Sequence, residues 1–350
     1  MSLILVVNAG STSLKLHAVD EDGHSVPVDS LDVAPTDLRA VAHRVVHGGA
    51  AFLDPVVIDS VVREKIGELV SVAPLHNAPA LDAIEKARTA LPDVPHIAVF
   101  DTSFHRTMPD AAAVYAVPRL WRERWGIRRY GFQGLSVEWC AERVPEVLGR
   151  PVDRLVVCHL GGGSSITAVR SGKSVDTTMG FTPLEGVPMT TRSGSVDPGA
   201  LLYVLREGHL DVDSLDHALN FDSGIQGLGG GSGGMVEIER RANAGDADAT
   251  LAIEVMLHHL AAAVAAMAAS AGGLDALAFT AGIGEGSALV RERLCARLGF
   301  LDVELDAARN QHAEPDCDVA TNGSRVRVLA IRAREELVAA RAARSLLAAG

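Results

Sequence analysis

The chain of 350 residues has no excess of positive charge. It contains 32 Lys and Arg residues against 44 Asp and Glu residues, which gives a formal net charge of −12. Nucleic acids and anionic membranes attract cationic surfaces and repel anionic ones. We therefore expect neither as the main partner, and a small-molecule ligand fits this composition better.

Cysteine is scarce and has no recognisable pattern. The four cysteines, Cys140, Cys158, Cys295 and Cys317, form no C-x-x-C pair and stand at no zinc-ligand spacing with histidines. Such a set indicates neither a disulfide framework nor a structural metal site. Reduced thiols, mostly buried, are the expectation.

Signals for export or membrane insertion are also missing. The opening residues MSLILVVNAGS lack the basic stretch and the cleavage site of a signal peptide, and they are typical of a buried strand. The longest weakly polar run, residues 260–273, is shorter than the roughly 20 residues that cross a bilayer as a helix. The sequence therefore predicts a cytoplasmic protein.

The composition is that of a globular protein large enough for two domains. Hydrophobic residues make up 48% of the chain and charged residues 22%, far from the composition of disordered chains. A length of 350 residues exceeds what one hydrophobic core usually serves. No linker rich in Pro or Ser divides the chain, so we infer the boundary near residue 103: residues 1–102 plus 335–350 form one domain, and residues 103–334 form the other.

Two short segments share one pattern of strand, small-residue turn and returning strand. The first has an apolar run at residues 3–8, the turn 9–13 and an alternating strand from residue 14. The second has an apolar run at 155–160, the turn 161–165 and a strand at 166–169. The repetition suggests two related halves facing one cleft.

Further helices and strands alternate along the chain. Residues 97–100 form a short apolar run typical of a buried parallel strand, and Asp101 follows at its end, where such sheets place ligands. The remaining pattern predicts helices at 59–69, 78–90, 249–271, 287–298 and 334–347, strands at 277–280 and 326–331, and a loop at 281–285. The whole is an α/β pattern.

Three strand-to-turn segments are rich in small residues, at 8–13, 161–165 and 282–287. Small side chains let backbone N–H groups approach an anion, and a helix that starts at Ser287 adds its positive end. A single glycine-rich turn is more often an ordinary tight turn, but three at strand ends favour phosphate binding. None matches G-x-x-x-x-G-K-[ST] or G-x-G-x-x-G, so neither the P-loop nor the dinucleotide fingerprint is present.

Several longer motifs occur in a recognisable order. They are VVNAGSTSLK, AHRVVHGG, APLHN, VFDTSFH, RRYGF, HLGGGSS, KSVDTTMGFTPLEG, TRSGSVDPG, FTAGIGEGS and EEL. In order and approximate spacing the chain resembles the acetate kinases from end to end. The resemblance implies a duplicated actin-like, ribonuclease H-like α/β fold, with two domains that close on a central cleft and usually pair as a homodimer. It also implies that the first domain lies on the acyl-substrate side, and that the second binds nucleotide and dimerises.

The resemblance assigns the catalytic residues Arg44, Asp101, Arg192 and Gln133. Phosphoryl transfer depends on neutralising charge around the transferred group, and the planar fork of arginine suits carboxylate and phosphoryl oxygens. Taken singly, each arginine is more often a structural ion-pair partner. The family motifs around Arg44 and Arg192 reverse that weighting.

The same resemblance implies the residues that bind the other groups. Mg²⁺ or Mn²⁺ would be held by Asn8 and Glu335, with Asp101 acting directly or through water, since magnesium usually takes one or two carboxylates. The residues expected to bind ATP or ADP are Asn8, Ser11, Ser13, Lys15, His159, Gly161, Gly163, Gly282, Gly284 and Glu285. The apolar pocket for the alkyl end of the substrate is expected at Val46, Leu75, Phe132 and Pro183.

The chain departs from the family pattern at several places. After RRYGF the family has His-Gly-Thr-Ser-His, whereas this chain has Gln133 as the first of these residues. Gln133 can donate an amide hydrogen bond but is never cationic, so charge stabilisation should weaken. In the nucleotide region an Asp-x-Arg segment is replaced at Gly234 to Val236, Arg334 replaces an Asn, and the chain is shorter between Lys15 and Arg44.

These features leave three functions open. The leading one is a kinase that moves a phosphoryl group reversibly between ATP and acetate or propionate. The second is the same acyl transfer with pyrophosphate or another donor, motivated by Gly234 and Val236. The third is a catalytically impaired paralogue that binds acyl phosphate or nucleotide, motivated by Gln133 and opposed by the intact arginines.

Overall fold

The computed structural model describes residues 3–9, 14–33, 35, 37–231 and 233–349, except the side chains of Pro74 and Leu75. The chain divides into two compact units. The first unit comprises residues 1–107, 114–139 and 334–350, and the second comprises residues 108–113 and 140–333. Residues 114–139, which the sequence boundary places in the second domain, therefore pack with the first unit.

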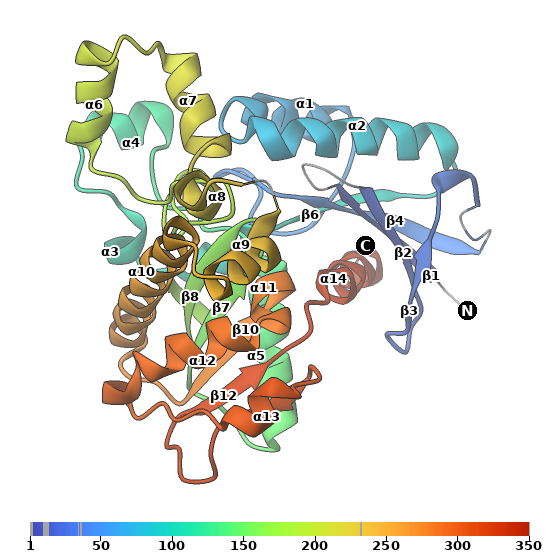
Figure 1. Cartoon of the computed structure of the whole chain (residues 1–350). Coiled ribbons are helices and arrows are strands. Elements are labelled where there is room, and N and C mark those ends of the chain that lie inside the picture. The colour runs from blue at the N-terminus through green and yellow to red at the C-terminus, as the bar shows by residue number, and fades with distance from the viewer. Residues whose placement is uncertain (1–2, 10–13, 34, 36, 232, 350) are drawn as a thin grey trace. The chain divides into compact units, whose positions relative to one another are not determined.

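The first unit is built on one sheet of six strands (Figure 1). The strands are β1 (Leu3–Ala9), β2 (Leu14–Val19), β3 (Ser25–Val28), β4 (Leu38–Val45), β5 (Val56–Val57) and β6 (His96–Phe100). Their order is β3-β2-β1-β4-β6-β5. Strands β1, β4 and β6 are parallel to one another, whereas β2, β3 and β5 pair antiparallel to their neighbours.

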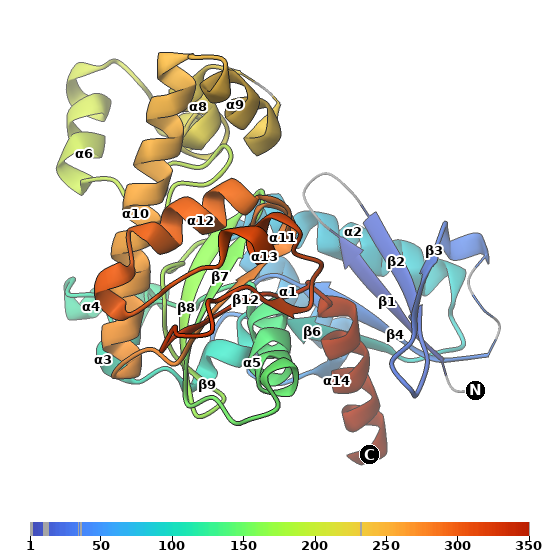
Figure 2. The same cartoon turned by 60° about the horizontal axis from the view of Figure 1, so that its bottom comes forward.

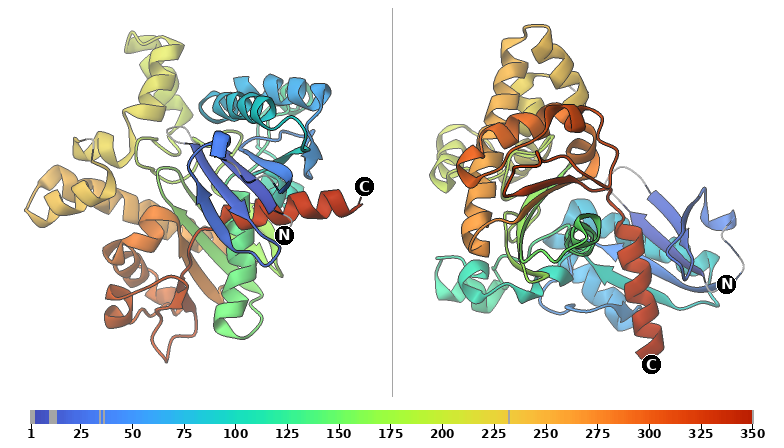
Figure 3. Two further views of the ribbon diagram at one scale, coloured as in Figure 1. Left: turned by 90° about the vertical axis from the view of Figure 1, so that its right-hand side faces the viewer. Right: turned by 90° about the horizontal axis from the view of Figure 1, so that it is seen from below.

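Alternate residues of this sheet point to two apolar layers. Ile4 and Val6 of β1 pack toward α14, and Leu5 and Val7 pack toward α2. Figure 3 shows α14 alongside these strands. A strand that is covered on both faces is a continuous apolar run, which is the pattern of β1 and β6.

The helices of the first unit are α1 (Ser60–Glu68), α2 (Pro74–Ala90), α4 (Arg119–Trp125) and α14 (Glu335–Ala349), with 3₁₀ turns at Leu31–Val33, Leu69–Ser71 and Ser103–Thr107. Among them, α2 and α14 pack against that sheet, and α1 packs against α2. Helix α5 (Gly134–Leu148) begins in the first unit and ends in the second. The Asp59 side chain accepts a hydrogen bond from the Val62 N–H and caps α1.

The second unit repeats the same sheet. Its strands are β7 (Arg154–Leu160), β8 (Ser164–Arg170), β9 (Lys173–Thr177), β10 (Ala276–Thr280), β11 (Cys317–Asp318) and β12 (Arg327–Ala330). Their order is β11-β12-β10-β7-β8-β9, and each pair runs in the direction of its counterpart in the first sheet. The two related halves that the sequence predicts are therefore confirmed at the level of strand order.

The helices of the second unit include one long core helix. They are α3 (Asp110–Ala113), α6 (Pro198–Glu207), α7 (Val212–Phe221), α8 (Gly224–Gly229), α9 (Gly234–Asn243), α10 (Ala247–Ala271), α11 (Ala281–Gly286), α12 (Ala288–Ala296) and α13 (Ala307–Gln311), with a 3₁₀ turn at Gly299–Leu301. Figure 2 shows α10 beside strands of the second sheet, and α12 packs against α10 and α13.

Two sequence expectations about these helices are wrong. Residues 281–285 form the short helix α11 and not a loop, since Ala281 begins the helix directly after β10. The argument that no apolar run could span a bilayer also fails, because α10 has 25 residues and is apolar enough to do so. Ten of its residues are buried within the second unit, against β7, β8, α8 and α9, as in the core helix of a globular domain.

The cysteines meet expectation. All four are free, with Cys140, Cys158 and Cys295 buried and Cys317 half-buried.

Candidate functional site

Three polar residues lie at the carboxyl ends of the parallel strands of the first sheet. Asn8 of β1 lies opposite Arg44 of β4 in the strand register. Asp101 follows β6 directly, and its N–H donates to the Val45 carbonyl at 3.0 Å. Because parallel strands end at one edge of a sheet, residues that are 36 and 57 positions apart in sequence meet there.

The guanidinium of Arg44 binds the Asp101 carboxylate through two nitrogens. Its Nε lies 2.9 Å from Oδ1, and its Nη2 lies 2.5 Å from Oδ2. The Asp101 side chain is almost fully buried and the Arg44 side chain is 17% exposed. Burial disfavours the charge on Arg44, but Asp101 and, more weakly, Glu335 together raise its pKa above the usual value. The two hydrogen bonds fix the orientation of the Arg44 guanidinium.

The other polar residues predicted for this region are Asn8, Lys15 and Glu335. Arg44 Nη1 donates to Asn8 Oδ1 at 3.0 Å. Lys15 lies opposite Asn8 on β2 and is exposed. Glu335 opens α14 and is close enough to Arg44 to raise its pKa. Five predicted site residues thus belong to one region of the first unit, while Ser11 and Ser13 lie outside the described residues.

Gln133 stands beside Asp101 in an unusual backbone conformation. Its φ is +61°, in the left-handed region that few non-glycine residues adopt. The N–H of Gly134 donates to the Asp101 carbonyl at 3.0 Å. A Cβ at Gly134 would lie 2.0 Å from that carbonyl oxygen, so only glycine permits this approach. Backbone strain at a functional position is a common finding.

A buried histidine that the sequence assignment missed supports this segment. His105 Nε2 donates to the carbonyl of Phe132 at 2.9 Å, directly before Gln133. Burial is the main effect that lowers the pKa of His105, to about 4, so the ring is neutral at pH 7. Its sequence signal is the last residue of the VFDTSFH motif.

Two further buried histidines, His43 and His96, form a pair on the face of β4 opposite to Arg44. His96 Nε2 is 3.0 Å from the Leu91 carbonyl, which can only accept, so this nitrogen carries the proton. His96 Nδ1 then accepts from His43 Nε2 at 2.9 Å, and His43 Nδ1 has no hydrogen-bond partner among the residues that the structure describes. Burial and then His96 lower the pKa of His43 to about 3, and burial lowers that of His96.

The residues expected in the acyl pocket are distributed over both units. Val46 and Phe132 are buried in the first unit, and the ring of His47 lies 5.2 Å from that of Phe132. Asn77, which the site prediction missed, holds the backbone of His47. Its Oδ1 accepts from the His47 N–H at 3.1 Å, and its Nδ2 donates to the His47 carbonyl at 3.0 Å. Pro183 belongs to the second unit, and the side chain of Leu75 lies outside the described part of the chain. The pocket stays a prediction.

In the second unit, glycine-rich segments occupy the equivalent strand ends. His159 of β7 lies opposite Thr280 of β10. Gly161 follows β7, and its N–H donates to the Gly163 carbonyl at 3.1 Å. A Cβ at Gly161 would lie 3.6 Å from that of Ala281. Two of the three predicted small-residue turns therefore lie side by side.

The segment after β10 is a tight helical turn. Ala281 has φ +65°, and the helix α11 that it opens contains Gly282, Gly284 and Glu285. Ser287 caps the next helix by accepting from the Val290 N–H at 3.0 Å, which confirms the predicted helix start. The Glu285 carboxylate accepts from the backbone N–H of Ala333 at 2.9 Å, so it fixes the chain just before α14.

Arg192 is held by neutral groups among its described contacts. Its Nη1 donates to the carbonyl of Pro183 at 3.1 Å and lies 3.8 Å from the Met189 sulfur. Burial lowers its pKa, although an arginine keeps its charge at neutral pH. The structure brings Arg192 and Pro183 together within the second unit.

The segment that departs from the family's Asp-x-Arg pattern, Gly234 to Val236, forms the start of α9. Val236 is 81% exposed there, with no polar side chain of its own to offer a ligand. Arg241 donates to the Gly230 carbonyl and binds Asp246, so it ties this glycine-rich segment to the start of α10.

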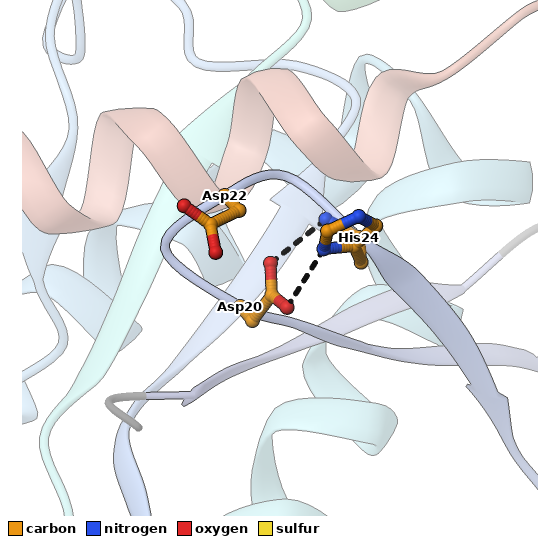
Figure 4. Close-up of side chains that lie close together, drawn as sticks. All are labelled: Asp20, Asp22 and His24. Carbon is orange, nitrogen blue, oxygen red and sulfur yellow. Dashed lines mark hydrogen bonds and ion pairs between the residues drawn. The ribbon is translucent and has the colours of Figure 1, made fainter.

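Two places offer side-chain ligands that suit a metal ion. Asn8, Asp101 and Glu335 supply one amide and two carboxylates, the hard donors that Mg²⁺ prefers, so the residues fit that ion. In the turn between β2 and β3, the ligand atoms of Asp20, Asp22 and His24 all lie within 4.8 Å of one another (Figure 4). Asp20 there accepts from the His24 N–H, which lowers its pKa, and this contact closes the hairpin.

Comparison with known proteins places this arrangement in a family. The family model described as the Acetokinase family matches residues 28–341. An acetate kinase of Nostoc punctiforme is 48% identical over 317 residues, covering 90% of this chain and 77% of that protein. The crystal structure of a propionate kinase from Francisella tularensis aligns with TM-score 0.91 and 34% identity over 98% of this chain and 99% of its own.

An acetate kinase structure from Porphyromonas gingivalis aligns with TM-score 0.87 and 31% identity, over 99% of this chain and all of its own. These likenesses confirm the two-domain α/β fold, consistent with an actin-like ATPase, that the motifs imply. The match to the family model spans the motifs that contain Arg44, Asp101 and Arg192. The chain belongs to the acetokinase family.

Proposed function

We propose that the protein transfers the γ-phosphoryl group of ATP reversibly to a short-chain carboxylate, acetate or propionate, and releases an acyl phosphate and ADP. The observation that carries the proposal is the Arg44 fork, fixed between Asp101 and Asn8 at the edge of the first sheet. The names of two similar proteins, an acetate kinase and a propionate kinase, support the same proposal.

The acceptor chemistry explains why arginines and not a base are needed. A carboxylate is ionised at pH 7, so its oxygen attacks the γ-phosphorus with no proton to remove. One P–O bond forms to the carboxylate, and the bond between the γ-phosphorus and the oxygen that bridges it to the β-phosphate breaks, leaving that electron pair on ADP. Attack of one anion on another requires positive charge around the transferred group. His43 and His105 are neutral at pH 7, because burial lowers the pKa of each, so they supply no such charge.

Each residue at this site then has a role. Arg44 and Arg192 neutralise the carboxylate and the transferred phosphoryl oxygens, and Asp101 holds the Arg44 fork in plane. Gln133 donates its side-chain amide to a phosphoryl oxygen from its fixed position beside Asp101. The small apolar end of the acid would contact Val46, Leu75, Phe132 and Pro183.

Mg²⁺, or Mn²⁺ in its place, would be held by Asn8 and Glu335, with Asp101 bound directly or through water. When bound, the ion neutralises phosphate charge at the donor. The nucleotide would lie against the second unit, where small residues leave backbone groups accessible, and Ser11, Ser13 and Lys15 would extend phosphate binding from the first. The residues proposed there are His159, Gly161, Gly163, Gly282, Gly284 and Glu285.

A second donor is a specific alternative. Val236 is 81% exposed in the stretch where the family has an Asp-x-Arg segment, so polar contacts to adenosine are fewer. Pyrophosphate needs phosphate contacts only, and the glycine-rich turns would supply those equally well. This observation favours acyl transfer from pyrophosphate as the runner-up.

A hydroxamate assay tests all of these readings. Acetate, propionate and butyrate are each offered with ATP, GTP and pyrophosphate, and acyl phosphate is trapped by hydroxylamine. We expect product with ATP and either acetate or propionate. If product forms with pyrophosphate alone, pyrophosphate is the donor and the ATP-dependent proposal is wrong. If no pair gives product in a protein that still binds ADP, the protein is a catalytically impaired paralogue.

A cytoplasmic homodimer is the expected form. The free cysteines suit a reducing compartment, and ATP is supplied there. Helices α6 and α7 expose several apolar side chains, namely Leu202, Tyr203, Val212 and Phe221. Exposed apolar residues on neighbouring helices are typical of an interface. Sedimentation analysis of the wild type and of Tyr203→Glu should show a dimer and a shift toward monomer.

A further inference from the structure

Arg291 is a charged residue in the interior of the second unit. It lies in the second turn of α12 and is 2% exposed, the largest of the nearly inaccessible side chains. An arginine at this depth is rare unless a carboxylate pairs with it. The groups that contact its guanidinium therefore decide how the charge is tolerated.

Every hydrogen bond of this guanidinium goes to a neutral oxygen. Nη1 donates to the carbonyls of Gly284 at 2.8 Å and Glu285 at 2.7 Å. Nε donates to Asn310 Oδ1 at 2.7 Å, and Nη2 donates to the Asn310 carbonyl at 3.1 Å. In the described part of the chain, the ion pairs of neighbouring arginines do not include Arg291, and no carboxylate pairs with it.

These contacts fix the corner between α11 and α12. The last carbonyls of a helix have no partner within the helix, and Arg291 takes two of those of α11. Asn310 is itself oriented, because its Nδ2 donates to the Ala288 carbonyl at 2.8 Å. The turn that contains Gly282 and Gly284 is thus held from behind by one side chain.

Within the described part of the chain, no carboxylate pairs with this charge. Burial lowers the pKa of Arg291, yet a guanidinium stays protonated at neutral pH. The nearby thiols offer no anion, since burial raises the pKa of Cys295 to about 12. A buried cation that touches only dipoles is costly to the folded protein, and that cost falls when an anion binds nearby.

We propose that Arg291 is a positioning residue for the phosphate donor: it fixes the turn at residues 282–285, and the donor's phosphates partly balance its buried charge. This inference rests on the proposed function. The donor is the partner of this charge because the turn begins at Ala281, beside Gly161 at the strand ends. A Cβ at Gly282 would meet no atom within 4 Å, so the backbone there is open to an anion.

The first test compares two arginines of one helix. Arg291→Met removes the charge and keeps an apolar side chain of similar length. Arg293→Met removes a half-exposed arginine that pairs with Glu254. We expect the KM for ATP to rise on the order of tenfold in Arg291→Met, with the KM for acetate changed less than about twofold. Arg293→Met should leave both KM values near wild type, and equal KM values in all three proteins overturn the proposal.

A second variant separates the charge from the fold. Asn310→Asp places a carboxylate beside Arg291 and keeps the oxygen that accepts from Nε. If the charge acts on the donor, the KM for ATP rises severalfold in a protein that urea unfolding shows to be folded, although the Nδ2 bond to the Ala288 carbonyl is lost. An unchanged KM for ATP in a folded Asn310→Asp protein refutes the charge argument, even where Arg291→Met fails to fold.

The wild type distinguishes the two levels of failure. ADP binding is measured by calorimetry beside the hydroxamate assay. If the wild type forms acyl phosphate and both variants match it, the role of Arg291 is wrong and the kinase function stands. If the wild type neither forms acyl phosphate nor binds ADP, the proposed function fails and the inference fails with it.

Discussion

The two sheets have one strand order but carry different residues at their strand ends. In the first sheet, Asn8, Arg44 and Asp101 end or follow the three parallel strands and bind one another. In the second, the equivalent strands β7 and β10 lead into Gly161 and Ala281. One copy of the scaffold thus presents charged side chains, and the other presents backbone.

This difference shows how one topology serves two parts of a reaction. A reacting centre needs fixed charges, which side chains supply. A phosphate chain needs close approach to N–H groups, which side chains would obstruct. Duplication of a sheet whose strand ends tolerate either solution supplies both.

The largest effect is expected from the arginines. Arg44→Ala and Arg192→Ala should each lower kcat by on the order of 10²-fold or more, because a charge that stabilises the transition state is lost. Lysine at either position should rescue only partly, since the planar fork is absent. Steady-state kinetics check this, with Arg63→Ala, which removes an exposed ion pair to Glu85, as the control. Wild-type turnover in either alanine variant contradicts the assignment.

Gln133→His should raise kcat by about tenfold, because a cation-capable donor then stands beside the transferred group. Histidine tolerates the left-handed conformation that this position requires. The measurement is kcat with ATP and acetate, with calorimetric ADP binding to confirm an intact second unit. A fall in kcat in a folded, ADP-binding variant would mean that Gln133 serves a different donor arrangement.

Acid should destabilise the first unit through its buried histidines. The unfolded chain binds protons as the pH falls below about 6.5, whereas folded His43 and His105 stay neutral down to about 3 and about 4. Their depressed pKa values therefore cause no loss above pH 6.5. Below it, each should remove about 1.4 kcal/mol of unfolding free energy per pH unit until its folded pKa is reached.

Urea unfolding between pH 7 and pH 4.5 measures that slope. His43→Leu should flatten it by one histidine, because the titration of that buried imidazole is removed. A slope that is equal in His43→Leu and wild type would remove His43 from this account.

The smallest effect is expected at Gly282. A Cβ there meets no atom within 4 Å, so Gly282→Ala should fold normally and gain up to about 1 kcal/mol of stability from its helical position. If donor phosphates approach this backbone, the KM for ATP should still rise severalfold. Gly134→Ala is the contrast, since its Cβ would clash with the Asp101 carbonyl and destabilise the fold. An unchanged KM in Gly282→Ala separates this glycine from the donor.

The local sequence predicted the elements that govern these sites. Both hairpins, the buried strand before Asp101 and the Ser287 cap follow from period, turn residues and capping chemistry. These features depend on neighbours in the chain. Motif resemblance, and not pattern, supplied the roles of Arg44 and Arg192.

Contacts between distant residues could not be predicted in this way. The bond from Arg44 to Asp101 spans 57 residues, and nothing local to either residue indicates it. Asn77 and Arg291 look like ordinary helix residues in sequence, because their importance lies in the carbonyls that the fold brings to them. Helix α11 was missed since its glycines are typical of a loop, whereas Arg291 supports it.

The backbone at Gln133 also restricts which residues can ever replace it. A φ of +61° must be accepted by any side chain at this position, whatever its chemistry. β-Branched residues such as valine or threonine would carry a penalty of roughly 1–2 kcal/mol there, while Gly, Asn, Asp and His would not. Mutational drift at this position is therefore confined to a few residues, and a saturation library should recover folded protein mainly from that set.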